Sequence, residues 1–365
     1  MTVDGAWQGR ISPDTHFFDA GGFTLESGAH LPEVRVAYRT WGRLNARGDN
    51  AILVCHALTG SADADDWWGG LFGPGRCLDP DRHFIICSNV LAGCYGTTGP
   101  MYPHPDDGAP WGSRFPRVTV RDMVALQARL LDTLDVSALA LVTGPSLGGM
   151  QVLEWAACFP ERVRAMAPIG VSARHSAWCI GISESQRQAI YADPDWQDGR
   201  YAPCRPPRHG LAVARMFAMI SYRSWENFES RFSRAPQPGD EQTFAVQSYL
   251  RHQGDKLHHR FDANTYVRLT EAMDSHDLGR GRGGDSAAVL SGLAMPALVV
   301  SVDSDVLYPP REQRWIAEYL PAARYEVLHS DAGHDGFLIT LEPLDAMLAS
   351  FLDSTQQLRP ASLAP

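Results

Sequence analysis

The sequence predicts an α/β fold, in which a mostly parallel sheet is flanked by helices and interrupted by an inserted helical segment. Three observations predict it. Short apolar runs alternate with helical patterns on either side of a central gap. A Gly-x-Ser-x-Gly pattern stands where one apolar run meets a helical stretch. Between residue 172 and roughly residue 290 the alternation stops, and prolines break a series of helical stretches.

The alternating elements define a core that is split in the sequence. Strand-like runs, several of them apolar on both faces as buried parallel strands are, occupy residues 34–40, 51–56, 84–90, 139–143, 165–171, 297–302 and 325–329. Helical patterns separate some of them, at residues 120–134, 150–159, 311–319 and 343–352, and the gap contains others, such as 210–220 and 265–273. We therefore expect a core made of residues 1–172 and 291–365, with a helical lid, residues 173–290, inserted between its halves.

Composition excludes several classes of protein. With 365 residues and 44% hydrophobic residues, the chain can bury a substantial core. The net charge of -10 argues against nucleic acid or an anionic membrane as the main partner. Seven cysteines without a CxxC pair predict neither a disulfide framework nor a zinc site, and a reducing cytoplasm is the expected location. Residues 1–10 do not resemble a signal peptide, and no run is long enough to span a bilayer. The GRGRGG stretch at 279–284 is interpreted as a flexible loop.

The serine of the Gly-x-Ser-x-Gly pattern, Ser146, is the candidate nucleophile. A strand that turns sharply into a helix needs glycines around the serine, and this arrangement is the nucleophile elbow of the α/β-hydrolase fold. The N–H of Leu147 lies at the amino end of the helix, where free donors and the helix dipole can stabilise an oxyanion. A second donor is expected from the loop after the run 51–55, and Leu58 is the candidate.

The base and its orienting carboxylate are expected later in the chain, in the order Ser, acid, His. Asp305, in the loop after the run 297–302, is the best-placed carboxylate, and Asp303 is the alternative. His334 follows the last strand-like run in a glycine-containing loop. His329 is the alternative, but it ends an apolar strand, where a lone histidine is more often structural. Without clustered Cys or carboxylate ligands, no metal site is expected.

Beyond the elbow, long segments of the chain resemble the homoserine O-acetyltransferases, a family with the α/β-hydrolase fold. The resemblance covers nearly the whole chain and rests on residues 38–42 (YRTWG), 56–60 (HALTG), 87–91 (CSNVL), 93–100 (GCYGTTGP), 144–151 (GPSLGGMQ), 214–216 (ARM), 248–251 (SYLR), 253–256 (QGDK), 260–264 (RFDAN) and 333–335 (GHD). It implies the same triad that the residue patterns predict, namely Ser146, Asp305 and His334. It also implies an acyltransferase of methionine biosynthesis that acts through an acyl-serine, with acetyl-CoA as donor substrate, L-homoserine as acceptor and no bound cofactor. A homodimer is expected, because exposed apolar helices of the lid would suit one.

The resemblance further implies residues that hold the acceptor. Arg215 would bind its α-carboxylate and Asp335 its α-ammonium, which agrees with their charges, and Tyr222 would assist. From the residues alone, a salt bridge in the lid for Arg215 and a loop-capping role for Asp335 would be preferred.

The donor and the acceptor stay open within the family, which contains acetyl and succinyl users and relatives that acylate serine. Leu307 stands two residues after the acid, where succinyl users have arginine, so acetyl is favoured. Pro145 and Leu147 replace the glycine and methionine of many relatives, a change that is expected to reshape the pocket and to retain the Leu147 N–H. The alternatives are a homoserine or serine O-succinyltransferase, a serine O-acetyltransferase, a serine esterase, and a binding protein without catalysis.

Overall fold

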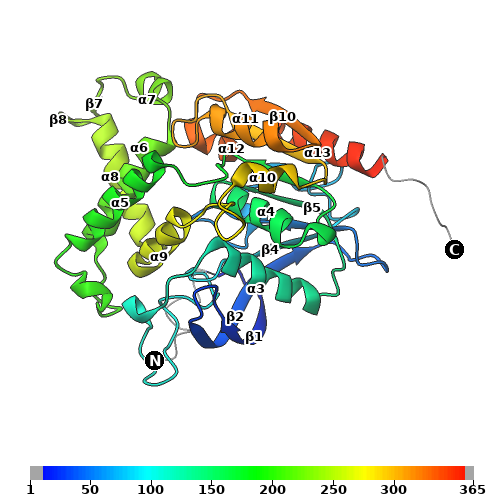
Figure 1. The fold of residues 1–365 in the computed structure, drawn as a ribbon. Coiled ribbons are helices and arrows are strands. Elements are labelled where there is room, and N and C mark those ends of the chain that lie inside the picture. Colours follow the sequence, from blue (N-terminus) through cyan, green and yellow to red (C-terminus); the bar gives the residue numbers. More distant parts are fainter. Residues whose placement is uncertain (1–10, 358–365) are drawn as a thin grey trace.

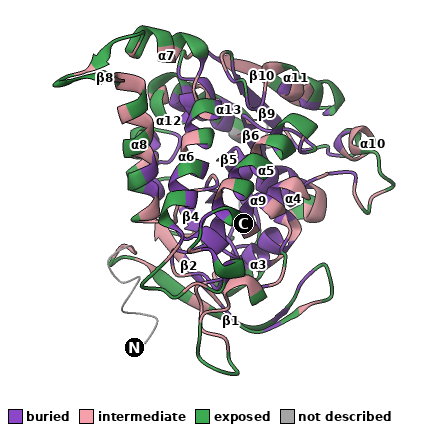
Figure 2. Ribbon diagram, turned by 90° about the vertical axis from the view of Figure 1, so that its left-hand side faces the viewer, coloured by how far each residue is buried: buried purple, intermediate pink, exposed green. Residues whose placement is uncertain are grey.

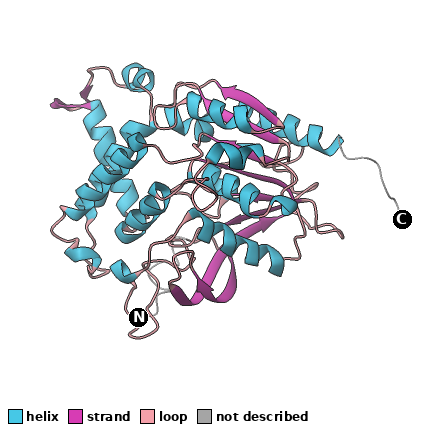
Figure 3. Cartoon of the chain, in the orientation of Figure 1, coloured by secondary structure: helices cyan, strands magenta, loops and turns pink. Residues whose placement is uncertain are grey.

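The central sheet has eight strands, in the order β1-β2-β4-β3-β5-β6-β9-β10 (Figures 1 and 3). The computed structural model describes residues 11–357. Residues 1–10, which are not expected to form a signal peptide, and the last eight residues of the predicted core lie outside the described residues. The strands are β1 (His16–Thr24), β2 (His30–Trp41), β3 (Ala51–Val54), β4 (Phe84–Ser88), β5 (Leu139–Pro145), β6 (Met166–Ile169), β9 (Ala297–Val302) and β10 (Ala323–Leu328). The pairs from β4 to β10 are all parallel. The predicted α/β-hydrolase fold is thereby confirmed.

The strand β1 is the element of the sheet that the sequence analysis missed. It pairs with β2 in an antiparallel hairpin whose register shifts on either side of Gly21. Glycines and irregular pairing weaken the period-two pattern by which strands are recognised. β2 in turn runs antiparallel to β4, so the parallel part of the sheet begins at β4.

Helices cover both faces of the sheet. They include α2 (Ala64–Trp67), α3 (Val120–Thr133), α4 (Leu147–Cys158), α11 (Pro310–Tyr319), α12 (Gly336–Ile339) and α13 (Leu341–Gln357). Successive side chains of a strand point to opposite faces, so Leu53 of β3 packs in one apolar cluster with α3 and α4, whereas Ile52 packs in a second with α13. The buried residues concentrate along the strands in Figure 2. Helices therefore bury both faces of the sheet, which explains why the strands are unbroken apolar runs in the sequence.

Between β6 and β9 the chain forms a layer of helices on one side of the sheet (Figure 1). It contains α5 (Ala177–Tyr191), α6 (Arg208–Tyr222), α7 (Trp225–Arg231), α8 (Ala245–His258), α9 (Ala263–Asp274) and a small antiparallel hairpin of β7 (Pro236–Gln237) and β8 (Asp240–Phe244). The remaining helix of this segment, α10 (Ser286–Ser291), lies beside α11 instead (Figure 1). The division into a core and a lid of residues 173–290 stays a prediction.

The glycine-rich segment 279–284 is not the flexible loop expected from its composition. Arg280 pairs with Glu26 at 2.9 Å, and Arg282 pairs with Glu154 at 2.7 Å. Glu154 belongs to α4, is 1% exposed and also accepts from Arg121. Ion pairs to the core therefore hold this loop, and charge rather than glycine content decides its structure.

Across residues 11–357, no helix combines the length and the apolar character that crossing a membrane requires.

Candidate active site

Ser146 lies at the junction of β5 and α4, in a backbone conformation that non-glycine residues rarely adopt. Its φ is 56° and its ψ is -122°, and its N–H donates to the Ile169 carbonyl of β6 at 2.9 Å. A conformation of this kind costs about 1–3 kcal/mol and persists only where the surroundings enforce it. The side chain is thus held at the carboxyl edge of the sheet, at the amino end of α4, by a strained turn.

The glycines of the elbow are required by the carbonyl of Cys55 at the end of β3. A Cβ atom at Gly144 would lie 2.3 Å from this oxygen, and one at Gly148 would lie 2.0 Å from it. Both distances are far inside van der Waals contact, and the obstacle is backbone, which cannot rotate away. The two glycines therefore let α4 approach β3 closely, which brings the loop after β3 next to Ser146.

Asp305 and His334 form a buried pair at the same edge. His334 Nδ1 lies 2.7 Å from Asp305 Oδ2, while Asp305 Oδ1 accepts from the N–H groups of Leu307 and Tyr308 at 2.8 and 2.9 Å. An ionised carboxylate with these partners fixes the proton of the histidine on Nδ1. His334 Nε2 is buried and has no hydrogen-bond partner in the described part of the chain, so it is the ring nitrogen that can accept a proton.

Gly170 connects the nucleophile to this pair. It follows Ile169, the residue that binds the N–H of Ser146. A Cβ atom at Gly170 would lie 3.7 Å from the Asp305 carboxylate and 3.7 Å from the His334 ring. The structure thus brings all three predicted triad residues to one place, and no hydrogen bond joins Ser146 to His334 within residues 11–357.

The two alternative residues pair with each other at the surface. His329 Nδ1 lies 2.9 Å from Asp303 Oδ2, and the side chain of His329 is 82% exposed. Asp303 also accepts from the N–H of Ser330. This pair joins the loop after β9 to the loop after β10, and no hydrogen bond within residues 11–357 links it to His334.

The loop after β3 carries a β-turn with Leu58 and Thr59 at its centre. The N–H of Gly60 donates to the Ala57 carbonyl at 2.9 Å, which closes the turn. His56 accepts from the N–H of Val90 at Nε2, so its Nδ1 donates to the Ala57 carbonyl at 2.8 Å. Burial of this ring lowers the pKa of His56 from 6.5 to about 4, which keeps it neutral as these bonds require.

The two candidate oxyanion donors are free. Neither the N–H of Leu58 nor that of Leu147 donates to an acceptor within residues 11–357. Leu58 is the second residue of its turn, and Leu147 is the first residue of α4, positions at which a turn or a helix leaves its N–H groups unused. The Gln151 amide donates to the Leu147 carbonyl at 3.2 Å and to the His56 carbonyl at 3.4 Å. It therefore ties the two segments together.

The predicted acceptor-binding residues also gather beside His334. The guanidinium of Arg215 lies 5.5 Å from the ring centre of Tyr222, which is itself 5.7 Å from that of His334. Asp335 is 9% exposed; burial raises the pKa of its carboxyl, and the charges of Arg223 and Arg215 oppose this rise. Burial also raises the pKa of Tyr222 to about 12. The arrangement is a half-buried cluster of one carboxylate, two guanidinium groups and a neutral phenol.

Arg223 is a member of this cluster that the sequence analysis missed. Its Nη2 lies 3.1 Å from Asp335 Oδ2, and its side chain is 14% exposed. Its position directly after Tyr222, at the end of a predicted helix, was the available signal. The helix α6 thus delivers Arg215, Tyr222 and Arg223 to the loop that carries His334.

That loop packs against the end of α6 without space for a side chain. Gly333 has a φ of 66°, and a Cβ atom there would lie 2.7 Å from Arg223 C and 2.7 Å from Ser224 N. Ser224 Oγ donates to the Asp331 carbonyl at 2.5 Å. His334 and the end of α6 are therefore fixed to each other.

Among the described residues, no group of three or more His, Cys, Asp or Glu side chains could hold a metal ion.

Comparisons with known proteins show which family the whole chain belongs to. The family model described as the alpha/beta hydrolase fold matches residues 50–339. Homoserine O-acetyltransferase of Trichormus variabilis is 56% identical over 349 residues, which cover 95% of this chain and 96% of that protein.

Among solved structures, homoserine O-acetyltransferase from Bacillus anthracis matches with a TM-score of 0.87 at 24% identity, over 93% of this chain and 97% of that one. Esterase E22 matches with 0.86 at 26% identity, over 93% and 99%. The fold is therefore common to transferases and esterases, and the family is shown by the 56% identity to the Trichormus variabilis homoserine O-acetyltransferase. The chain belongs to the homoserine O-acetyltransferase family of the α/β-hydrolase fold.

Proposed function

We propose that the chain transfers an acetyl group from acetyl-CoA to the γ-hydroxyl of L-homoserine through an acetyl-serine intermediate. The observation that carries this proposal is the position of the charged cluster of Arg215, Arg223 and Asp335 directly beside the buried His334. A hydrolase needs the triad and an oxyanion hole, because its acceptor is water. A zwitterionic acceptor also needs a cation and an anion close to the base.

In the first half-reaction, Ser146 attacks the thioester carbonyl. His334 Nε2 takes the hydroxyl proton, and Asp305 stabilises the resulting imidazolium through the 2.7 Å bond to Nδ1. The N–H groups of Leu58 and Leu147 bind the oxyanion. Collapse of the tetrahedral intermediate breaks the C–S bond, and the CoA sulfur leaves with the proton from His334.

In the second half-reaction, homoserine takes the place of CoA. His334 Nε2 removes the proton of the γ-hydroxyl as its oxygen attacks the acetyl-serine, and the same donors hold the second oxyanion. When this intermediate collapses, Ser146 leaves and takes back the proton. O-acetylhomoserine is released and the free enzyme is restored.

The charged cluster positions the acceptor. Arg215 binds the α-carboxylate, and Asp335 binds the α-ammonium. Burial raises the pKa of Asp335, and Arg223 opposes this rise, since a nearby guanidinium favours the charged carboxylate. The cluster orients the hydroxyl of homoserine toward His334, whereas a water molecule has no charged groups for the cluster to bind. Transfer is therefore favoured over hydrolysis. The helices of residues 173–290 act as the lid that limits the access of water.

The acetyl donor is supported by Leu307. It is 5% exposed and joins the acid loop through its backbone N–H. An apolar side chain two residues after the acid offers no counter-charge to the free carboxylate of a succinyl group.

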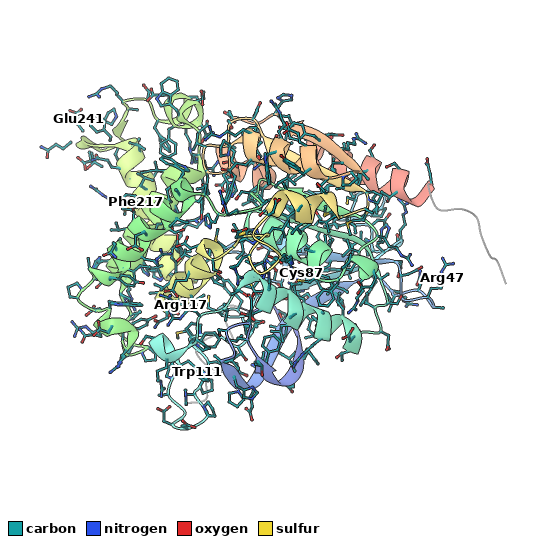
Figure 4. All side chains as sticks on the ribbon, viewed as in Figure 1. Arg47, Cys87, Trp111, Arg117, Phe217 and Glu241 are labelled. Atoms are coloured by element: carbon teal, nitrogen blue, oxygen red, sulfur yellow. The ribbon has the colours of Figure 1, made fainter. Side chains whose placement is uncertain are left out.

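The chain acts as a homodimer in the cytoplasm. Val213, Phe217 and Ile220 form an exposed apolar stripe along α6, and Phe217 projects from the lid in Figure 4. Such a stripe suits an interface between copies, which sedimentation would reveal as a doubled mass. All seven cysteines are free thiols, as a reducing compartment favours.

Steady-state release of CoA tests the function. Acetyl-CoA or succinyl-CoA is supplied with homoserine, with serine or without acceptor. Release that depends on homoserine and acetyl-CoA, and that disappears in Ser146→Ala, would support the proposal. A preference for serine or for succinyl-CoA would move the activity within the family, and release that ignores the acceptor would identify a hydrolase.

A further inference from the structure

An arginine from the helical segment between β6 and β9 binds the β-turn that carries Leu58. Arg260 lies between α8 and α9, about 200 residues further along the chain. Its Nη1 donates to the Thr59 carbonyl at 2.8 Å, and its Nη2 lies 3.4 Å from Thr59 Oγ1. A guanidinium that reaches two atoms of one residue fixes the orientation of that residue as well as its position.

A second bond holds Arg260 itself. Its Nη1 also donates to the phenolic oxygen of Tyr95 at 2.7 Å. Tyr95 is 7% exposed, and its carbonyl accepts from the side chain of Asn89, which in turn accepts from the N–H of Ala62. Hydrogen bonds through Tyr95 and Asn89 therefore connect Arg260 to Ala62, at the far end of the loop after β3.

The other polar contacts named for this turn come from its own loop and from α4. His56 and the N–H of Gly60 bind the Ala57 carbonyl, and Gln151 binds the His56 carbonyl. These contacts fix the first half of the turn. Thr59, in the second half, receives its side-chain contacts from Arg260 in the described part of the chain.

We infer that Arg260 is a positioning residue for the oxyanion hole, which holds the Leu58–Thr59 part of the turn so that the Leu58 N–H points at the oxyanion. The inference rests on the proposed acyl-serine mechanism. An oxyanion donor is effective because it is oriented before charge develops, and loss of one donor typically lowers kcat by about 10²–10³. A donor that is present but loosely held should cost a part of this, about 10- to 100-fold in the rate of acylation.

The test uses two acyl donors, acetyl-CoA and p-nitrophenyl acetate, because the second has no nucleotide. Pre-steady-state acylation of Ser146 is measured with each donor in the wild type, Arg260→Ala and Arg260→Lys. We expect the acylation rate of Arg260→Ala to fall by the same factor, about 10- to 100-fold, with both donors. The KM for homoserine should stay unchanged. Lysine should restore little, because an ammonium cannot make the forked contact, whereas added guanidinium ion should restore part of the rate of Arg260→Ala.

Several results would overturn the inference. A loss confined to acetyl-CoA would mean that Arg260 binds the nucleotide of CoA, and equal rates in wild type and Arg260→Ala would mean that the turn holds itself. Tyr95→Phe removes one support of Arg260 and should lower both acylation rates about two- to fivefold, so it serves if Arg260→Ala does not fold. Arg251→Ala, an exposed arginine of α8, is the matched control and should match the wild type. If the wild type itself gives no burst, the acyl-serine mechanism fails and not this inference alone.

Discussion

Replacing Asp305 by asparagine tests the proposed triad with a change of a single atom. Asp305 Oδ1 accepts from two backbone N–H groups at 2.8 and 2.9 Å, and Oδ2 faces His334 Nδ1 at 2.7 Å. In Asp305→Asn the amide oxygen must take the place of Oδ1, because an NH₂ group there would face two donors. The NH₂ group therefore faces His334.

The consequence is the wrong tautomer of His334. Its Nδ1 must now accept from the amide, so the ring proton moves to Nε2, which can no longer take the proton of Ser146. In a serine protease triad, the equivalent substitution lowers kcat by about 10⁴. Each factor of ten corresponds to about 1.4 kcal/mol, so the barrier should rise by about 5.5 kcal/mol. Stability should change little, by about 1 kcal/mol, since both backbone bonds remain.

The assay is single-turnover acylation by acetyl-CoA, with urea unfolding to show that the variant is folded. Asp303→Asn is the matched control: it is the neighbouring carboxylate, also bonded to a histidine and a backbone N–H, but exposed at the surface. We expect it to keep the wild-type rate. The reasoning would be refuted if Asp305→Asn kept more than about a tenth of the acylation rate, or if Asp303→Asn lost as much as Asp305→Asn.

Three further outcomes are expected. Asp335→Asn should raise the KM for homoserine about 10- to 100-fold while the acylation burst persists, because a charge-assisted bond of about 1.5–3 kcal/mol is lost from the acceptor alone. Asp331→Asn, in the same loop, is the control. A fall in the acylation rate of Asp335→Asn as large as the rise in KM would contradict the assignment. Glu154→Gln should lower the free energy of unfolding by about 3–5 kcal/mol in urea titrations, since it leaves Arg121 and Arg282 without their shared buried carboxylate; a change below about 1 kcal/mol would show that the loop 279–284 is held otherwise. Stability should also fall in acid, because the pKa of His56 is about 4 in the folded protein and 6.5 ordinarily, so the unfolded chain binds the proton more tightly. This contribution is fully present above about pH 6.5 and is lost toward pH 4, by at most about 3 kcal/mol; unfolding free energies measured across this range should depend less on pH in His56→Gln, and an unchanged dependence would contradict the explanation.

The sequence was sufficient for the parallel sheet and for the elbow, for a physical reason. Buried parallel strands are continuous apolar runs, and a serine between glycines at a strand end has few other uses. The edge strand β1 was not predicted because glycines and a shifting register break its alternating pattern. Such a strand is defined by its pairing with a neighbouring strand more than by its own residues.

Charge pairs between distant segments could not be predicted. The partner of Arg280 is Glu26, more than 250 residues away, and that of Arg223 is Asp335. Composition made the first segment look flexible, and the position of Arg223 directly after Tyr222, the signal that was available, does not reveal its partner. Tertiary contacts decide both cases, and they depend on a topology that local patterns do not encode.

The absence of a side chain at Gly333 has a consequence for how the acceptor preference of this scaffold can be altered. Any larger residue there would push the backbone of Arg223 and Ser224 away, and with it the end of α6. Libraries that randomise the loop around His334 should therefore yield mostly inactive variants, whereas libraries on the inner face of α6 can vary the pocket while the base stays in place. Substitutions on α6 should therefore change the pocket, whereas the loop around His334 has to keep its sequence and its position.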